Sequence, residues 1–218
     1  MTKILYAYIN EQNHKAILEN FLSDFPQDFQ TKILKYRRWE DAQLTLIGRL
    51  LLKLGLRSFD IEYKEEDLLF SDYNKPILKN KHVKFNISHS GTIVVCIITN
   101  SSDVGIDIEK VHNINVFDFT AQMTDFEFNK IKNATDSQAA FFDFWTQKEA
   151  VIKAHGKGLS IPLNTFCVID DHARIDKNEF FLKKLEIDED YKCYLAFKDK
   201  RVEEETIPKR IRFLEKGK

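Results

Sequence analysis

The apolar segment TIVVCIIT (92–99) constrains the fold most strongly, because it is the most buried strand that the sequence predicts. The segment before it, FNISHSG (85–91), begins with the apolar–polar alternation of a strand. A tight connection is then expected over Ser88, His89, Ser90 and Gly91. Turn chemistry explains the serines and the glycine, but it does not explain a histidine between two hydroxyl groups.

Helical and extended patterns alternate along the rest of the chain. Apolar spacing predicts a helical stretch over 28–54 with a break at 37–39, and helices over 116–132 and 137–154. The segments FCVID, FFLKKLEID and YKCYLAFK alternate as strands of a C-terminal meander. Strands and helices in both halves predict an α+β protein, with the crossover between Val111 and Val116.

Composition excludes several classes of protein. The chain has 218 residues with 33 basic and 34 acidic side chains, so it lacks the basic field that nucleic-acid binding needs. Its three cysteines form no CxxC pair, which argues against a zinc site or a disulfide framework. The opening MTKILYAYIN resembles a first strand rather than a signal peptide, and no apolar run approaches the roughly 20 residues of a membrane span. We therefore expect a cytoplasmic protein that binds neither membrane nor nucleic acid.

Two carboxylates share one face of the predicted strand VGIDIEKV (104–111). Asp107 and Glu109 project together, about 7 Å apart, and repel each other unless a cation lies nearby. A solvent-exposed polar face is the alternative. Glu149, on the helix FFDFWTQKEAVIKAH, offers a third carboxylate, although with Lys153 it could form a plain surface ion pair. Three carboxylates without His or Cys favour Mg²⁺.

Four motifs in order, NKPIL, FNISHSG, GIDIEK and FWTQKEAVIKAHGKGL, resemble those of the 4′-phosphopantetheinyl transferases. The similarity runs from Lys32 to Ser160 and is greatest to the two-lobed, surfactin-synthetase-activating (Sfp) type. It implies two similar α+β lobes (1–112 and 113–218) related by a pseudo-two-fold axis, with the active site in the cleft between them. It also implies a monomer, because the trimeric holo-acyl-carrier-protein synthase type has chains of about half this length.

The resemblance implies that the phosphopantetheine arm of coenzyme A is transferred to a serine of an acyl or peptidyl carrier protein. Adenosine 3′,5′-bisphosphate would be released. Carried over to this sequence, the Mg²⁺ ligands are Asp107, Glu109 and Glu149. The residues implied to bind coenzyme A are His89 and Ser88 at a phosphate, Lys153 and Lys148 along the pyrophosphate, Lys32 and Lys75 at the 3′-phosphate with Pro76 adjacent, and Thr45 near the adenosine.

Glu127 has two interpretations. Thr124 stands three residues before it, which is the pattern of a capping box at a helix start. The resemblance instead places a glutamate here near the metal, as a base or an extra ligand. The catalytic set implied is therefore Glu149, Lys153, His89 and Glu127, and the serine proton could pass to Glu149, Glu127 or metal-bound water. The chain departs from the family at Phe29, where a lysine is common.

Two rival functions follow from the same residues. Ser88 and His89 could suggest a hydrolase triad, but they are adjacent in sequence and no GxSxG turn or oxyanion loop is visible. The second rival is a non-catalytic protein that binds coenzyme A or a carrier protein, and the intact carboxylates argue against it. A carrier-docking surface is expected within 117–132, whose apolar residues could equally pack in the core: Phe117, Phe119, Met123 and Phe126.

Overall fold

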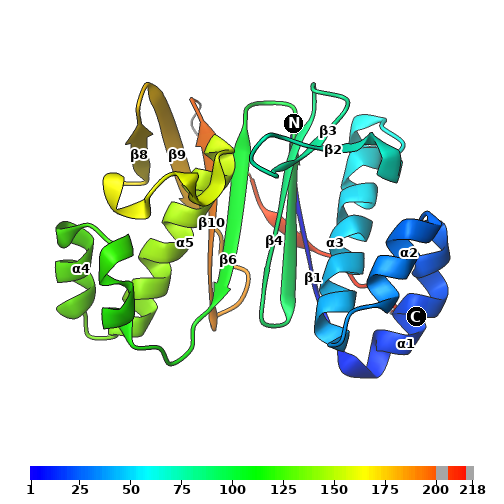
Figure 1. Cartoon of the computed structure of the whole chain (residues 1–218), viewed down its shortest axis with the longest axis horizontal. Helices are drawn as coiled ribbons and strands as arrows, with labels where there is room; N and C mark the ends of the chain where they lie inside the picture. Colours follow the sequence, from blue (N-terminus) through cyan, green and yellow to red (C-terminus); the bar gives the residue numbers. More distant parts are fainter. Residues whose placement is uncertain (200–205, 215–218) are drawn as a thin grey trace.

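The computed structural model describes residues 1–199 and 206–214, and these form two sheets with helices on their outer faces (Figure 1). The first sheet has the order β11 (Pro208–Arg210), β1 (Thr2–Tyr8), β5 (Ile93–Thr99), β4 (Lys84–Ser90). The second has the order β6 (Val104–Lys110), β10 (Tyr191–Lys198), β9 (Asn178–Lys184), β8 (His172–Ile175), β7 (Val168–Ile169). A short hairpin joins β2 (Leu68–Phe70) to β3 (Pro76–Leu78).

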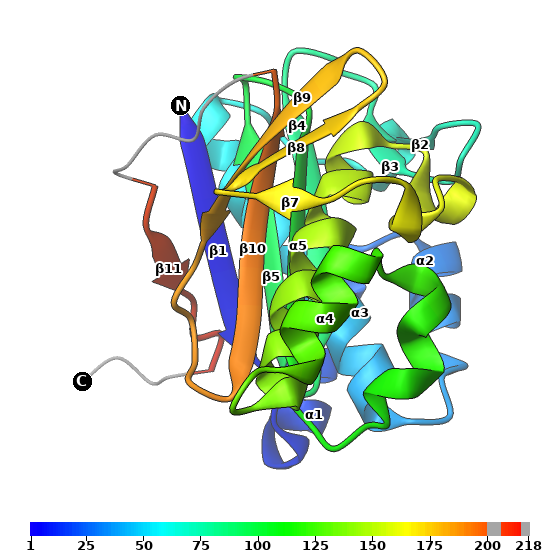
Figure 2. The ribbon, with the colours of Figure 1, turned by 90° about the vertical axis from the view of Figure 1, so that its left-hand side faces the viewer.

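The helices separate into two groups, one for each sheet. Figures 1 and 2 show α1 (His14–Phe21), α2 (Gln27–Leu34) and α3 (Trp39–Leu56) beside the first sheet, and α4 (Asp125–Lys132) and α5 (Ser137–His155) beside the second. The break expected at 37–39 is confirmed, because α2 ends at Leu34 and α3 begins at Trp39. The helix expected over 116–132 is instead the 3₁₀ segment η5 (Val116–Gln122) followed by α4.

Strand β5 is fully buried because it faces a core on each side. Val94, Cys96 and Ile98 pack with α3, while the alternate residues Ile93, Val95 and Ile97 pack against the second sheet. The second sheet contributes its own apolar face to that shared core, so the two sheets lie back to back with helices outside. This placement accounts for the uninterrupted apolar run in the sequence.

Each half of the chain repeats one connectivity. In the first half β1, α3, β4 and β5 give the strand order β1-β5-β4, and in the second β6, α5, β9 and β10 give β6-β10-β9. All four strand pairs are antiparallel. The α+β class is confirmed, and the repeated order is what two similar lobes require; a pseudo-two-fold axis stays a prediction.

The division of the chain between the sheets falls before β6. This strand lies within the range 1–112 expected for the first lobe, yet it pairs with β10 of the second sheet. The reason is that residues 100–103 already carry the chain from one sheet to the other, ahead of the crossover expected near 111–116. The C-terminal part also returns to the first sheet, where β11 pairs in parallel with β1.

The expected tight connection over 88–91 is wrong in position. Strand β4 continues to Ser90, and His89 pairs in register with Val94 of β5. The turn is made by Gly91 and Thr92, and Gly91 has φ +53°, a conformation that glycine adopts at little cost. His89 is therefore held by a strand, not by a loop.

The long helices are not membrane spans. Among the residues that the structure describes, no helix combines the length and apolar character needed to cross a bilayer.

We predict that Gly105→Ala destabilises the protein by about 3 kcal/mol. A Cβ at this position of β6 would overlap the backbone of α5 at the Ala150 carbonyl oxygen and the Ala154 nitrogen, so helix and strand must separate. Urea unfolding followed by circular dichroism measures the loss. Gly48→Ala is the control: its Cβ meets the Ile87 side chain at 3.3 Å and helix propensity favours alanine, so a change within about 1 kcal/mol is expected. Equal effects of the two substitutions would contradict the argument.

Candidate active site

The edge strands of the two sheets, β4 and β6, lie side by side in the middle of the molecule (Figure 1). Side chains of β4 satisfy backbone donors of β6. The Asn86 Oδ1 atom accepts from the Ile106 N–H at 2.8 Å, and the Ser90 Oγ atom accepts from the Lys110 N–H at 3.1 Å. These side chains act as spacers, and we call the space between the two strands the seam.

A buried polar cluster occupies the middle of the seam. Ser88 donates its hydroxyl proton to Asp107 Oδ1 at 2.8 Å, and Lys153 donates to Ser88 Oγ at 3.0 Å. The Lys153 ammonium also forms an ion pair with Asp107 Oδ1. Asp107 is only 2% exposed, and its second oxygen, Oδ2, is buried with no hydrogen-bond partner among the described residues. Three elements, β4, β6 and α5, meet at this cluster.

The two remaining carboxylates expected in the site lie within electrostatic range of Asp107. The pKa of Glu149 is raised to about 7, chiefly by burial; Lys153 lowers it, and Asp107 and Glu109 add to the rise. Burial also raises the pKa of Glu109, with Asp107 adding to the effect and the hydrogen bond that Ser90 donates at 2.7 Å opposing it. The pKa of Lys153 is raised, because Asp107 and the other carboxylates outweigh its desolvation.

These carboxylates fit a hard cation by chemistry but do not form a closed cage. Within 1–199 and 206–214, no three His, Cys, Asp or Glu side chains converge closely enough to hold one ion. Mg²⁺ commonly uses one or two protein carboxylates and completes its shell with water and phosphate oxygens. The unpartnered Asp107 Oδ2 and the desolvated Glu109 and Glu149 are suited to such an open site.

His89 lies on the face of β4 opposite Ser88 and Ser90, because successive strand residues alternate. It lines a cavity of about 180 Å³ together with Thr45 of α3 and Pro76 of β3. Burial lowers the pKa of His89, and the nearby Lys153 lowers it further. The structure thus brings three residues implied to bind coenzyme A to one cavity in the first lobe.

Lys75 and Lys32 lie elsewhere. The Lys75 ammonium donates to the carbonyl oxygens of Lys153 at 2.6 Å and Val104 at 3.2 Å, so it joins the first lobe to the C-terminal end of α5. Desolvation lowers the pKa of Lys75 to about 8. Its side chain lines a second cavity, of about 410 Å³, at the start of β4. Lys32 is exposed on α2.

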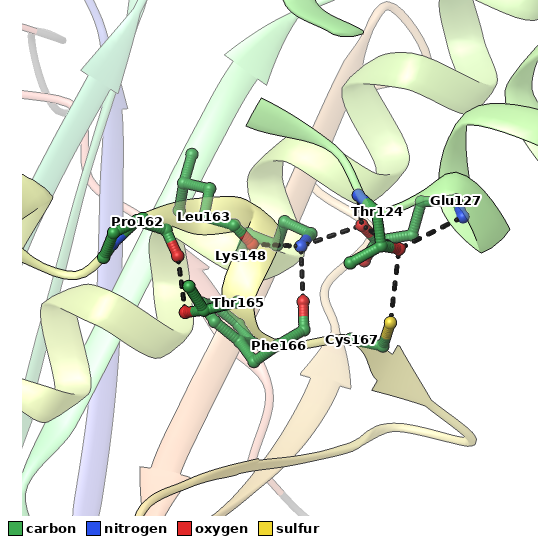
Figure 3. Close-up of polar contacts among 8 residues, drawn as sticks. All are labelled: Thr124, Glu127, Lys148, Pro162, Leu163, Thr165, Phe166 and Cys167. Carbon is green, nitrogen blue, oxygen red and sulfur yellow. Dashed lines mark hydrogen bonds and ion pairs between the residues drawn. The ribbon is translucent and has the colours of Figure 1, made fainter. Parts of the chain in front are cut away.

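Glu127 and Lys148 are not brought to the seam. Both side chains are fully buried and form an ion pair of 2.8 Å between α4 and α5 (Figure 3). Phe29, at the family's lysine position, is buried with its ring tilted against that of Phe25, so it contributes to the first core rather than to a phosphate site.

Sequence reasoning missed the roles of Asn86 and Ser90 as spacers. The signal was present in FNISHSG, where every second residue is polar, but the expected turn at 88–91 broke the alternation too early. Extending the strand by three residues, to Ser90, would have placed Asn86, Ser88 and Ser90 on one face and His89 on the other.

The seam gathers carboxylates and a lysine beside a cavity with a histidine, and these are groups that an enzyme acting on an anionic substrate would use. Two family models match the chain: "4′-phosphopantetheinyl transferase, N-terminal" over residues 12–101, and "4′-phosphopantetheinyl transferase superfamily" over residues 103–202. The chain belongs to the 4′-phosphopantetheinyl transferase superfamily.

Individual relatives agree with this assignment. The chain is 31% identical to the 4′-phosphopantetheinyl transferase Sfp of Bacillus subtilis, over 87% of this chain and 89% of that protein. It is 30% identical to the 4′-phosphopantetheinyl transferase gsp of Aneurinibacillus migulanus, over 88% of this chain and 84% of that protein. The resemblance to the Sfp type is thereby confirmed.

We predict that Lys75→Met alters how stability depends on pH. The folded protein holds Lys75 at a pKa of about 8 and the unfolded chain at 10.5, so the unfolded state binds the additional proton between these values. Stability of the native protein therefore rises with pH across this window, by up to about 1.4 kcal/mol per unit from this group. Urea unfolding at pH 7.5, 8.5 and 9.5 should show a steeper rise for the native protein than for the variant, and parallel curves would refute the assignment.

Proposed function

We propose that the protein transfers the 4′-phosphopantetheine arm of coenzyme A to a serine of an acyl or peptidyl carrier protein and releases adenosine 3′,5′-bisphosphate. The observation that carries this proposal is the polar cluster of the seam, where Lys153 and Asp107 meet Ser88 between the two sheets. Family membership supports the reaction, and the seam supplies the charges that it needs.

The chemistry follows from charge. The carrier serine oxygen attacks the phosphorus that bears pantetheine, and the pyrophosphate bridge to the adenosine half breaks. Lys153 donates to the phosphate oxygens as negative charge develops on the leaving group. Glu149, half-buried on α5 and facing the same carboxylates, accepts the serine proton. His89 and Thr45 hold the phosphorylated end of coenzyme A in the first-lobe cavity.

We further propose Mg²⁺ as the cofactor, held by Asp107, Glu109 and Glu149. When bound, it supplies positive charge to the pyrophosphate and to the leaving group. The support is the chemistry of the donors: carboxylates only, two of them with pKa values raised by burial and mutual repulsion. Lys32 and Lys75 are proposed to contact the 3′-phosphate of coenzyme A.

A cytoplasmic monomer that binds neither nucleic acid nor membrane remains part of the proposal. The near-zero net charge of −1 argues against nucleic-acid binding, the free thiols of Cys96, Cys167 and Cys193 fit a reducing compartment, and the monomer rests on the chain length of 218 residues.

The first experiment is intact-protein mass spectrometry of an apo carrier protein incubated with the enzyme, coenzyme A and Mg²⁺. We predict a mass gain of one phosphopantetheine arm, abolished by EDTA and restored by excess Mg²⁺. Asp107→Asn and Glu149→Gln should lower the rate by about 100-fold or more. Glu186→Gln, a carboxylate 82% exposed on the second lobe, is the control and should leave the rate unchanged.

Each alternative gives a different result. Coenzyme A binding without transfer to any acyl or peptidyl carrier would favour the non-catalytic binder. Full transfer in EDTA would remove the metal from the proposal, and full activity of Asp107→Asn would remove that ligand.

We predict that His89→Gln weakens coenzyme A binding by about tenfold at pH 6.5 and less at pH 8. The free imidazole has a pKa below 6.5, and a bound phosphate favours its protonated form. Affinity of the native protein should therefore rise as the pH falls from 8. The phosphate of the ligand titrates in both proteins, so the informative quantity is the difference between native protein and variant in how coenzyme A affinity changes with pH. Isothermal titration calorimetry at several pH values measures it, and an equal change in both proteins would exclude a phosphate contact by His89.

A further inference from the structure

The buried pair of Glu127 and Lys148 lies apart from the seam, and its geometry assigns it a role. Glu127 belongs to the first turn of α4, and Lys148 lies in the middle of α5. Figure 3 shows the lysine side chain ending between the glutamate and the segment that carries Leu163 and Phe166. Three separate stretches of the second lobe therefore meet at one ammonium group.

The hydrogen-bonding capacity of Lys148 is fully used. Its Nζ atom donates to the carbonyl oxygens of Leu163 and Phe166, each at 2.6 Å, and lies 2.8 Å from Glu127 Oε2. An ammonium group has three protons, so none remains for a phosphate of coenzyme A. The Phe166 ring lies 4.6 Å from the same nitrogen and closes the site further. Contact with a phosphate would require breaking bonds that are fully buried.

Glu127 is held through one of its two carboxylate oxygens, since its Oε1 atom is buried with no hydrogen-bond partner among the described residues. Its Oε2 atom accepts from the Thr124 backbone nitrogen at 3.0 Å and from the Thr124 hydroxyl at 2.9 Å, in addition to Lys148. The Thr124 hydroxyl accepts in turn from the Glu127 N–H, which completes a capping box. A general base must reach the proton that it removes, and the Glu127 carboxylate is fully buried and paired with Lys148, away from the seam.

We propose that Glu127 and Lys148 are positioning residues, which fix the start of α4 and the 163–166 segment against α5 for the reaction with the carrier protein. The inference rests on the proposed function. The exposed surface of α4, with Phe126 44% exposed next to Glu127, takes its position from this pair. The cavity that holds His89 and Thr45 is in the first lobe and does not depend on it.

This role predicts a particular division of effects. Lys148→Met and Glu127→Gln should each raise the KM for the carrier protein by about tenfold, while kcat and the affinity for coenzyme A stay within about twofold. The double variant Glu127→Gln/Lys148→Met should be no worse than the poorer single variant, because both changes break the same contact. A phosphate ligand and a general base would instead give independent, multiplying losses.

The experiment combines steady-state transfer kinetics with calorimetric titration of coenzyme A in the absence of carrier. Lys132→Met is the matched control, since it removes an exposed lysine from α4 without touching the pair. An equal rise in KM for this control would overturn the proposal, because charge on the surface would then explain the effect. Weaker coenzyme A binding by Lys148→Met would also overturn it, as would a loss of kcat with a changed pH profile in Glu127→Gln alone.

The same set of variants also tests whether a loss of activity comes from misfolding. Either single change leaves one buried charge without its partner and lowers the thermal midpoint, whereas the double variant leaves none and should recover part of that loss. If a single variant does not fold, the double variant carries the kinetic test. Absence of transfer by the native protein would refute the proposed function separately; the recovery of stability in the double variant then still tests whether the two residues act as a unit.

Discussion

The ion pair of Lys153 with Asp107 is the contact on which the candidate site depends. It joins α5 to β6, and through Ser88 it reaches β4, so a single ammonium group connects both sheets. Gly105 permits it, because any side chain there would hold α5 away from β6. The charges of Asp107, Glu149 and Glu109 all act on Lys153, and burial raises the pKa values of Glu109 and Glu149. The site is therefore short of positive charge, which is the reason that a divalent cation is proposed there.

The seam also keeps an edge strand of each sheet from being exposed. Unpaired edge strands attract other chains, and here the edges β4 and β6 cover each other. Direct backbone pairing would have closed the space between them. Asn86 and Ser90 instead satisfy donors of β6 through their side chains, so the gap stays wide enough for Ser88, Asp107 and the end of Lys153.

Local patterns predicted much of this arrangement, and long-range contacts account for what they missed. Alternation along β6 predicted that Asp107 and Glu109 share a face, and the capping box at Thr124 was visible three residues before Glu127. The acceptors of Lys148 lie 15 and 18 residues away in an irregular segment, and no periodicity points to them. The repeated connectivity of the two halves leaves no shared side-chain pattern, because strand order is set by backbone pairing; two similar lobes were implied by the family resemblance alone.

Lys148 and Lys153 lie on the same helix, α5, but their side chains point in different directions and have different partners. An α-helix advances about 100° per residue, so two side chains five positions apart point about 140° away from each other. Lys148 therefore enters the interior beside α4, where two carbonyl oxygens and a carboxylate occupy all its protons. Lys153 points toward β4 and β6, where its side chain remains 28% exposed. Its partners there are the side chains of Asp107 and Ser88, and a phosphate could take their place as acceptor. The two lysines therefore suit the different roles proposed for them, because Lys148 has fixed backbone acceptors and Lys153 has side-chain neighbours that a substrate could replace.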